Sequence, residues 1–461
     1  MKRWLETAKT VILSLLVITS FCLTGMIWIN QPNLQFIEPA KYTESKPVLE
    51  KSLEKMITPS AVVFHYGQDR HTKAVATDGQ YSMIMREMPR WIFLDFTPYT
   101  LTHEKWEEIA REKLGLEVRF RSNLPLSAVG RLVTFREEYN IRLMGIDRIW
   151  LYHEPEEDLV YALFLSGEEE KVMRSRTSIS PKDLRESYLA NGNQMPEQIM
   201  KVVIPAKYNT SDPESKGYSY WHMYYLPKHQ IRMQQFRFSY TTVPTEQLME
   251  AYFLDPTLVR QIMERDKTVI YTDGSRSIQV RSEQKAITFT DPAYQQRILP
   301  ITDEEKLQSA VSFVNKHLGW LDDYYLEDIK KSYNDKDSIT FRQYVGAYPL
   351  VSKGEKPIDT IEIISEAGQV VTMSRSMLDL ETYITNRDLT VMSGPELYQL
   401  IRDKNLANTE EISNTYLAYQ TFVSDDYIEL IPTWVVEVPN QPTLLIPAKS
   451  NEGGGRANGL E

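Results

Sequence analysis

A run of 20 residues without a formal charge, from Thr10 to Ile29, constrains this chain more than any other feature of its sequence. At about 1.5 Å per residue, a helix of this length crosses about 30 Å of hydrocarbon. The residues before it carry three positive charges and one negative charge, on Lys2, Arg3, Lys9 and Glu6. The positive-inside rule then predicts a cytoplasmic N-terminus at 1–9, a transmembrane anchor at 10–29 and an extracytoplasmic remainder.

This segment is expected to remain as an uncleaved anchor. It is longer than the apolar region of a signal peptide, and no small-x-small cleavage site follows Trp28-Ile29-Asn30. The single cysteine of the chain, Cys22, lies inside it. The later residues therefore have no disulfide, no Cys-ligated zinc and no Cys nucleophile.

One side of the expected anchor helix combines hydroxyl, glycine and aromatic residues. At about 100° per residue, this face consists of Thr10, Ser14, Val17, Phe21, Thr24, Gly25 and Trp28. Small and hydroxyl residues allow transmembrane helices to approach closely and to hydrogen-bond to each other. Two interpretations stay open. The face binds a partner helix, or the helix is a passive anchor whose Ser and Thr side chains bond to its own backbone.

The composition after the anchor is that of folded domains, with 42% hydrophobic and 25% charged residues in the whole chain. The net charge of −11 argues against a general nucleic-acid binder. No later segment reaches about 18 apolar residues, so we expect a single-pass protein of the cell membrane. The expected parts after the anchor are a stalk at 30–58, domains at 59–168, 169–291 and 301–450, and a flexible tail at 451–461.

The fold class predicted for these parts is α+β, with three extracytoplasmic domains built on antiparallel sheets after one N-terminal transmembrane helix. Residues 268–280 hold two β-rich runs joined by Asp273-Gly274. This pattern predicts a hairpin with a two-residue type I′ turn.

Helix starts are the other clear local signals. The run from Thr302 to Glu305 has the pattern of a capping box, and Ser393 with Pro395 opens a second helix. Asp255-Pro256 predicts a helix start as well, with Leu258, Val259 and Ile262 on the helix that follows.

The sequence contains no motif of a common enzyme class. It has no His-Glu-x-x-His pattern, no Gly-x-Ser-x-Gly elbow, no Walker loop and no dinucleotide fingerprint. We therefore expect no catalytic residue, no cofactor and no metal ion.

Two groups of residues with metal-binding chemistry have a simpler interpretation. His65 and His71, with Asp69 between them, would bind a metal only if folding brought them together, and their spacing matches no established site. Polar loop histidines are the better interpretation. The acidic run after His153 lacks the alternating oxygen ligands and central glycine of a calcium loop, so it is read as a solvated turn.

Paired carboxylates and an aromatic run are the remaining candidates. Glycoside hydrolysis needs two carboxyl groups about 5–10 Å apart across a cleft, which the adjacency of Asp322-Asp323 or Asp425-Asp426 does not establish. Surface charge is the default for both pairs. The run 218–225 would form a sugar or partner platform, but its alternation favours a half-buried strand.

The segment 255–276, DPTLVRQIMERDKTVIYTDGSR, resembles the YycH family. The arrangement of the chain is similar as well: a short basic N-terminus, one anchor and three extracytoplasmic domains. A glycine often stands in that family at the position of Lys267, so the chain departs from the pattern in this turn. The segment marks a fold, not a catalytic site.

The resemblance implies a non-enzymatic regulator of the WalK/WalR two-component system of cell-wall homeostasis. Its implied partners are the sensor kinase WalK and the protein YycI, and it favours the partner-binding interpretation of the anchor face. The rival hypothesis is an anchored protein that binds or processes wall polysaccharide. A deep cleft with convergent carboxylates or histidines would favour that rival.

Overall fold

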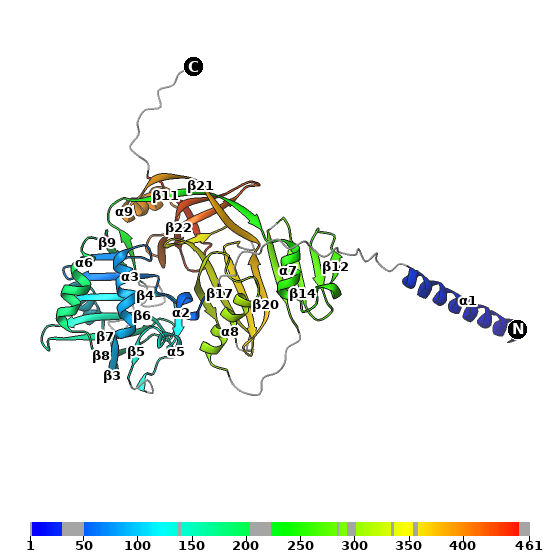
Figure 1. Ribbon diagram of the computed structural model, residues 1–461, viewed down its shortest axis with the longest axis horizontal. Helices are drawn as coiled ribbons and strands as arrows, with labels where there is room; N and C mark the ends of the chain where they lie inside the picture. The colour runs from blue at the N-terminus through cyan, green and yellow to red at the C-terminus, as the bar shows by residue number, and fades with distance from the viewer. Residues whose placement is uncertain are drawn as a thin grey trace, which may run out of the picture. The chain divides into compact units, whose positions relative to one another are not determined.

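The computed structural model describes residues 2–29, 50–136, 140–202, 223–283, 285–292, 301–332, 336–353 and 358–450. The chain forms two units, 1–45 and 46–461. The first contains helix α1, Lys2–Ile29, which covers the expected anchor and begins within the expected cytoplasmic N-terminus (Figure 1). Judged on the described residues alone, no helix is long and apolar enough to cross a membrane. Residues 30–49 of the expected stalk and the expected tail 451–461 lie outside the described residues.

The second unit begins with a sheet of ten strands in the described residues. Its order is β10-β9-β2-β1-β4-β6-β7-β8-β3-β5. The strands are β1 Ala61–Tyr66, β2 His71–Ala74, β3 Ile92–Pro98, β4 Leu114–Pro125, β5 Thr134–Phe135, β6 Gly145–Glu154, β7 Leu159–Ser166, β8 Lys171–Thr177, β9 Glu197–Val202 and β10 Met223–Pro227. The helices of this part are α2 Leu53–Met56, α3 Gly79–Glu87, α4 His103–Glu107, α5 Leu126–Val129 and α6 Ala190–Gly192.

Both faces of this sheet are covered, because its central strands are apolar almost throughout. Strand β7 is buried from Val160 to Ser166. One face packs against α3 and the π-helical segment Asp183–Leu189. The other packs against Trp106 of α4 and the π-helical segment Glu108–Glu112.

A second sheet, of fourteen strands in the described residues, follows in the sequence. Its path runs β12-β13-β14-β15-β20-β19-β17-β18-β22-β23-β11-β21, with β16 on β17 and β24 on β23. The strands are β11 Ile231–Thr242, β12 Arg260–Met263, β13 Val269–Thr272, β14 Ser277–Arg281, β15 Ala286–Thr290, β16 Asp323–Lys330, β17 Lys336–Val345, β18 Tyr348–Val351, β19 Thr360–Glu366, β20 Gln369–Ser376, β21 Leu378–Val391, β22 Asn414–Val423, β23 Ile428–Glu437 and β24 Leu444–Pro447. Helices α7 Thr245–Tyr252, α8 Asp303–Lys316 and α9 Gly394–Asp403 accompany it (Figure 1).

The α+β fold class and the antiparallel sheets are confirmed, but the expected central domain at 169–291 has no sheet of its own. Strands β8, β9 and β10 complete the first sheet, whereas β11 to β15 belong to the second. The sequence pattern identifies strands and does not identify their partners, and β11 pairs with β21 more than a hundred residues later.

The expected end of the stalk at residue 58 also needs correction. Residues 50–58 belong to the folded body, because Leu53, Met56 and Ile57 are buried in a hydrophobic core. That core is continuous from the first sheet to the second, and it includes Phe64 of β1 and Phe341 of β17.

Both capping signals are confirmed. In α8 the Thr302 hydroxyl accepts the Glu305 N–H at 3.2 Å, and the Glu305 carboxylate accepts the Thr302 N–H at 2.8 Å. The same reciprocal pair forms between Ser393 and Glu396 at the start of α9.

The expected helix after Asp255 is wrong. The Asp255 carboxylate accepts the Thr257 N–H at 3.0 Å, but only the 3₁₀ turn Pro256–Leu258 forms before strand β12 begins. Pairing of β12 with β13 replaces the helix, an example of tertiary structure overriding a local signal.

The hairpin at 268–280 is confirmed with a different turn. Thr272 lies opposite Ser277, so four residues connect the strands. The Asp273 carboxylate accepts the N–H groups of Ser275 and Arg276, each at 2.8 Å, while Gly274 takes a φ of 96°. This side-chain capped loop takes the place of the expected two-residue turn.

Candidate functional site

The expected partner-binding face lies on helix α1. Ser14, Val17, Phe21 and Thr24 are all exposed, and the Thr24 hydroxyl donates to the Ser20 carbonyl oxygen at 2.8 Å. Thr10, Gly25 and Trp28 belong to the same helix, but their side-chain surroundings lie outside the described part of the chain. The bond from Thr24 satisfies one hydroxyl within the helix and leaves the apolar members of the face open.

The clearest polar cluster of the body forms around two histidines that folding does bring together. His65 on β1 and His71 on β2 are cross-strand neighbours, and their Nδ1 atoms are 2.9 Å apart. Both side chains are buried, so the interpretation as polar loop histidines is wrong. The strand pairing, which the spacing of six residues did not reveal, places them side by side.

The hydrogen bonds of this pair fix where its protons lie. Nε2 of His71 is 3.1 Å from Oδ1 of Asp69 and donates to it, so Nδ1 of His71 is an acceptor. Nδ1 of His65 must then carry the donated proton. Burial lowers the pKa of His65 well below its usual value, and the positive charges of Arg119 and of His71, when it is protonated, act in the same direction. Burial also lowers the pKa of His71, against the opposing effect of Asp69. Both rings are therefore neutral near pH 7.

A buried carboxylate completes the cluster. Glu117 on β4 has one oxygen 3.9 Å from Nε2 of His65 and accepts the Tyr225 hydroxyl proton at 2.9 Å. Its other oxygen is 3.2 Å from the guanidinium of Arg119. Burial and the adjacent carboxylate raise the pKa of Tyr225 well above its usual value. The Arg148 guanidinium, also buried, adds positive charge nearby.

The centre of this cluster is closed to solvent, whereas Asp69 at its rim is half exposed. His65 and Glu117 are fully buried, and the indole of Trp150 stacks on His65 with ring centroids 4.2 Å apart. In the described residues, no group of three or more His, Cys, Asp or Glu side chains is placed to hold a metal ion. Through these contacts the cluster joins β1, β2, β4 and β10.

An open cleft of about 430 Å³ lies on the polar face of the second sheet. Its lining residues are Arg121, Glu327, Asp328, Lys330, Thr340, Arg342, Thr360 and Glu362. Arg342 already pairs with Glu327 at 3.1 Å and with Asp359 at 2.7 Å. Arg121 donates to the Tyr344 hydroxyl at 2.9 Å. Both guanidinium groups are therefore occupied by partners within the protein.

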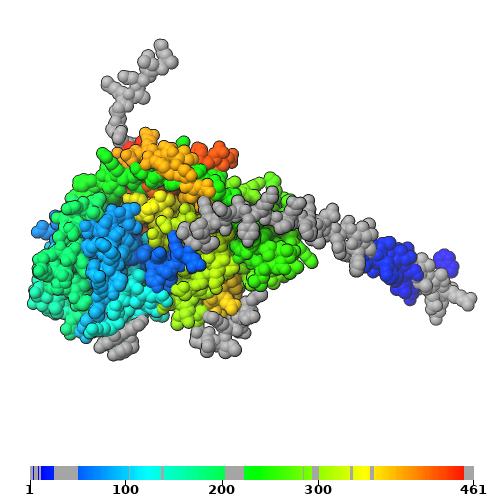
Figure 2. Space-filling model, in the orientation of Figure 1, coloured from blue at the N-terminus to red at the C-terminus, as the bar shows by residue number. Residues whose placement is uncertain are grey.

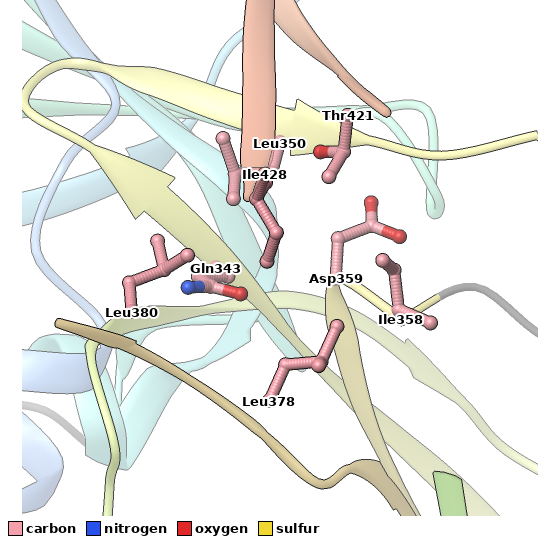
Figure 3. A pocket seen from close by; sticks show the side chains of 8 residues that line it. All are labelled: Gln343, Leu350, Ile358, Asp359, Leu378, Leu380, Thr421 and Ile428. Carbon is pink, nitrogen blue, oxygen red and sulfur yellow. The ribbon is translucent and has the colours of Figure 1, made fainter. Parts of the chain in front are cut away.

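A much smaller cavity, of about 10 Å³, lies between strands of the second sheet (Figure 3). Leu350 and Ile428 converge on it from one side and Leu378 from the other, with Gln343, Asp359 and Thr421 supplying polar atoms. This volume holds a single water molecule at most. The cavity does not accommodate a sugar or a peptide.

The two aspartate pairs have different environments. Asp322 is mostly buried and accepts a hydrogen bond from the Gln343 amide at 2.6 Å, whereas its neighbour Asp323 is exposed and pairs with Lys51 at 3.0 Å. Burial, with the charge of Asp379, raises the pKa of Asp322 to about 7. The interpretation of Asp322 as a surface charge is therefore wrong. Asp425 and Asp426 are exposed in the turn between β22 and β23.

The remaining candidates follow their plain interpretations. His153 bonds to Asp158 across the acidic turn at 3.2 Å. In the aromatic run, residues 218–222 lie outside the described residues. Tyr224 and Tyr225 belong to the core, as expected, but all residues of β10 are buried, so the strand is not half-buried. The sequence did not single out Glu117, because a lone carboxylate within an apolar strand has no motif.

Comparison with known proteins assigns the whole body to one family. A family model described as the YycH protein, N-terminal domain, matches residues 6–190, and one described as the YycH protein, C-terminal domain, matches 222–447. The break between them, like the break between the two sheets, falls within the region of the expected central domain.

One match in sequence and one in structure extend along most of the chain. The two-component system WalR/WalK regulatory protein YycH of Bacillus subtilis (strain 168) is 22% identical over 464 residues, covering 95% of each chain. A crystal structure of YycH from Bacillus subtilis superimposes with a TM-score of 0.65 at 16% identity, covering 87% of this chain and 98% of that one, and so supports the fold. The chain belongs to the YycH family.

Proposed function

We propose that this protein is a non-enzymatic regulator of the WalR/WalK two-component system, which controls cell-wall homeostasis. The observation that carries the proposal is the relationship along 95% of both chains to a protein named as a WalR/WalK regulator. The closed histidine cluster and the occupied arginines of the open cleft support a regulatory role over an enzymatic one.

The proposed location is the cell membrane, with residues 1–9 in the cytoplasm and the body outside. The uncharged run at 10–29 and the basic residues before it support this topology. The WalK sensor histidine kinase and YycI are the proposed partners, and the anchor face from Thr10 to Trp28 is the proposed contact with helices of the kinase.

Such a contact regulates without chemistry. If the anchor packs better against one arrangement of the kinase helices, it shifts their equilibrium by that difference in affinity. A coupling free energy of about 1–3 kcal/mol changes the population by about 5–150-fold. Interhelical hydrogen bonds and close packing at small residues are of this order.

The test is a pull-down from crosslinked, detergent-solubilised membranes. It compares the full chain with a variant whose residues 10–29 are replaced by an unrelated span. Recovery of WalK and YycI with the native span alone is the expected result. Equal recovery with both spans would place the interface in the body, and recovery of wall polymer without the kinase would favour a polysaccharide-binding or wall-processing protein.

A finer variant replaces Thr10, Ser14, Thr24 and Gly25 together with leucine. We expect altered WalR-dependent transcription at an unchanged protein level. The matched control changes Leu15, Leu16 and Ile18, which lie largely off this face, to valine. Unchanged transcription in the leucine variant would make the helix a passive tether.

A further inference from the structure

Strand β12 forms an open end of the second sheet. It pairs with β13 on one side, and it is the last strand of the sheet path in the described residues (Figure 1). All four of its side chains are exposed. An exposed edge presents unpaired N–H and C=O groups, which another extended segment can complete.

The surface around this edge is unusually apolar for a solvated strand. Leu254, Leu258, Ile262 and Met263 lie within ten residues of sequence, and each is between 52% and 91% exposed. Soluble proteins usually protect an edge with charge, bulges or a covering loop. Exposed apolar side chains beside unpaired backbone groups indicate an edge that is covered by a partner.

The backbone pattern shows which groups point outward. The Glu264 N–H donates to the Thr268 carbonyl oxygen at 2.9 Å, so these two residues form a hydrogen-bonded pair of the antiparallel ladder. Such pairs alternate with non-bonded ones. Ile262 therefore also bonds toward β13, while the backbone groups of Gln261 and Met263 point away from the sheet.

The sequence of this edge is complementary to itself in that register. If a second copy lies antiparallel with Ile262 opposite Ile262, Gln261 of each copy lies opposite Met263 of the other. The outward backbone groups then meet as hydrogen-bonded pairs. Arg260 of each copy lies opposite Glu264 of the other, on the same face as the two isoleucines. In the described residues, neither Arg260 nor Glu264 has an ion pair within its own chain.

We propose that two copies of this chain associate through β12, antiparallel, about a two-fold axis at Ile262. The arrangement is isologous, because each copy offers the same strand and closes the edge of the other. Two Arg260–Glu264 pairs set the register, and the isoleucines and the outward backbone groups form its centre. The net charge of −11 makes two copies of the chain repel each other in general. The opposite charges of Arg260 and Glu264 therefore favour association at this edge. The inference does not depend on the proposed regulatory function.

Disulfide formation tests the register. In the full chain with Cys22 replaced by serine, Ile262→Cys places two thiols opposite each other in a non-bonded pair, with Cα atoms about 4.5 Å apart. This lies within the range that a disulfide bridges. The matched control is Gln261→Cys, whose two copies lie two residues further apart, beyond about 7 Å.

We expect oxidation of membranes to give a crosslinked dimer of Ile262→Cys, seen on gels without reductant, and at most a trace with Gln261→Cys. Equal crosslinking of both variants would overturn the register. No crosslinking of Ile262→Cys, in protein that resists proteolysis like the parent, would overturn the dimer. Crosslinking to a different protein would give the edge to that partner and overturn the proposal.

A charge exchange provides the second test. Light scattering measures the dimerisation of the full chain in detergent. Arg260→Glu and Glu264→Arg each place like charges opposite one another, and we expect each to weaken the dimer about tenfold. The double variant restores both pairs with reversed signs and should dimerise like the parent. A double variant as weak as the single ones would contradict the proposed pairing.

Discussion

At the scale of single residues, the most informative position is Asp322. Its neighbour Asp323 faces solvent, whereas Asp322 is held against Gln343 in a site where burial raises its pKa to about 7. In the unfolded chain an aspartate has a pKa of about 3.9. Between these two values the folded state binds the extra proton, so stability falls as the pH rises through this window.

The change Asp322→Asn removes this titration while keeping an oxygen for the Gln343 amide. We expect similar free energies of unfolding for the two proteins near pH 4, and a growing advantage for the variant up to about pH 7. The difference has an upper limit of about 4 kcal/mol, at about 1.36 kcal/mol for each pH unit.

Urea denaturation of the full chain in detergent, at a series of pH values, measures this difference. Asp323→Asn is the matched control, because it removes the neighbouring carboxylate that faces solvent. A difference between Asp322→Asn and the parent that stays constant from pH 4 to 8 would contradict the shifted pKa.

The residue scale also shows what the sequence could not predict about the candidate site. The residue types of His65, Asp69 and His71 are capable of binding a metal, but their contact depends on the register of β1 with β2. Glu117 and Tyr225 join them from strands far along the chain. A pattern within one segment carries no information on such neighbours. The anchor face is different, because helical geometry alone places its residues on one side.

At the scale of elements, caps are where local sequence and structure agree best. Thr302 is exposed, so its contribution to α8 comes from the hydrogen bonds of the capping box and not from packing. We expect Thr302→Ala to lower the free energy of unfolding by about 1 kcal/mol. Thr302→Ser keeps the accepting oxygen and should retain most of it. Thermal or urea unfolding of both variants measures the effect, and equal losses would show that the hydroxyl does not cap the helix.

The packing of elements also explains why the predicted helix after Asp255 does not form. Thr302 is followed by a helix whose Leu307, Val311 and Val314 are buried, so the local signal and the packing agree. Asp255 caps only a 3₁₀ turn in place of the expected helix, and Leu258 and Ile262 after it are exposed. A short helix is only marginally stable when no other surface buries its apolar residues. Here the backbone forms hydrogen bonds with β13 as a strand instead.

At the scale of the whole molecule, strand order was beyond the sequence. Strands β10 and β11 are close neighbours in the chain, yet they belong to different sheets. The second sheet collects strands from Ile231 to Pro447, and β11 and β15 pair with β21 and β20, which come much later in the sequence. Turn and cap signals act over a few residues, so they located elements and predicted the fold class without fixing how many sheets those elements build.

The entry of the chain into the body is a second feature of this scale. The segment from Lys51 to Met56 lies at the seam between the two sheets, shown as the dark blue surface near the centre of Figure 2. Asn315 of α8 holds its backbone, accepting the Lys51 N–H at 3.1 Å and donating to the Lys51 carbonyl oxygen at 2.9 Å. Lys51 also pairs with Asp323. These bonds fasten the start of the body, as far as the structure describes it, to α8 and β16.

Asn315→Ala should release this segment while the sheets stay folded. It leaves the Lys51 backbone and the Trp320 indole N–H, which also donates to Asn315 at 2.7 Å, without their partner, at a cost of about 1–3 kcal/mol. We expect faster hydrogen exchange at residues 51–57 and little change in β6 or β7. Asn315→Asp, which keeps the acceptor and loses only the donor to Lys51, should give an intermediate effect. Unchanged exchange in the alanine variant would show that α2 is held by its buried Leu53 and Met56 alone.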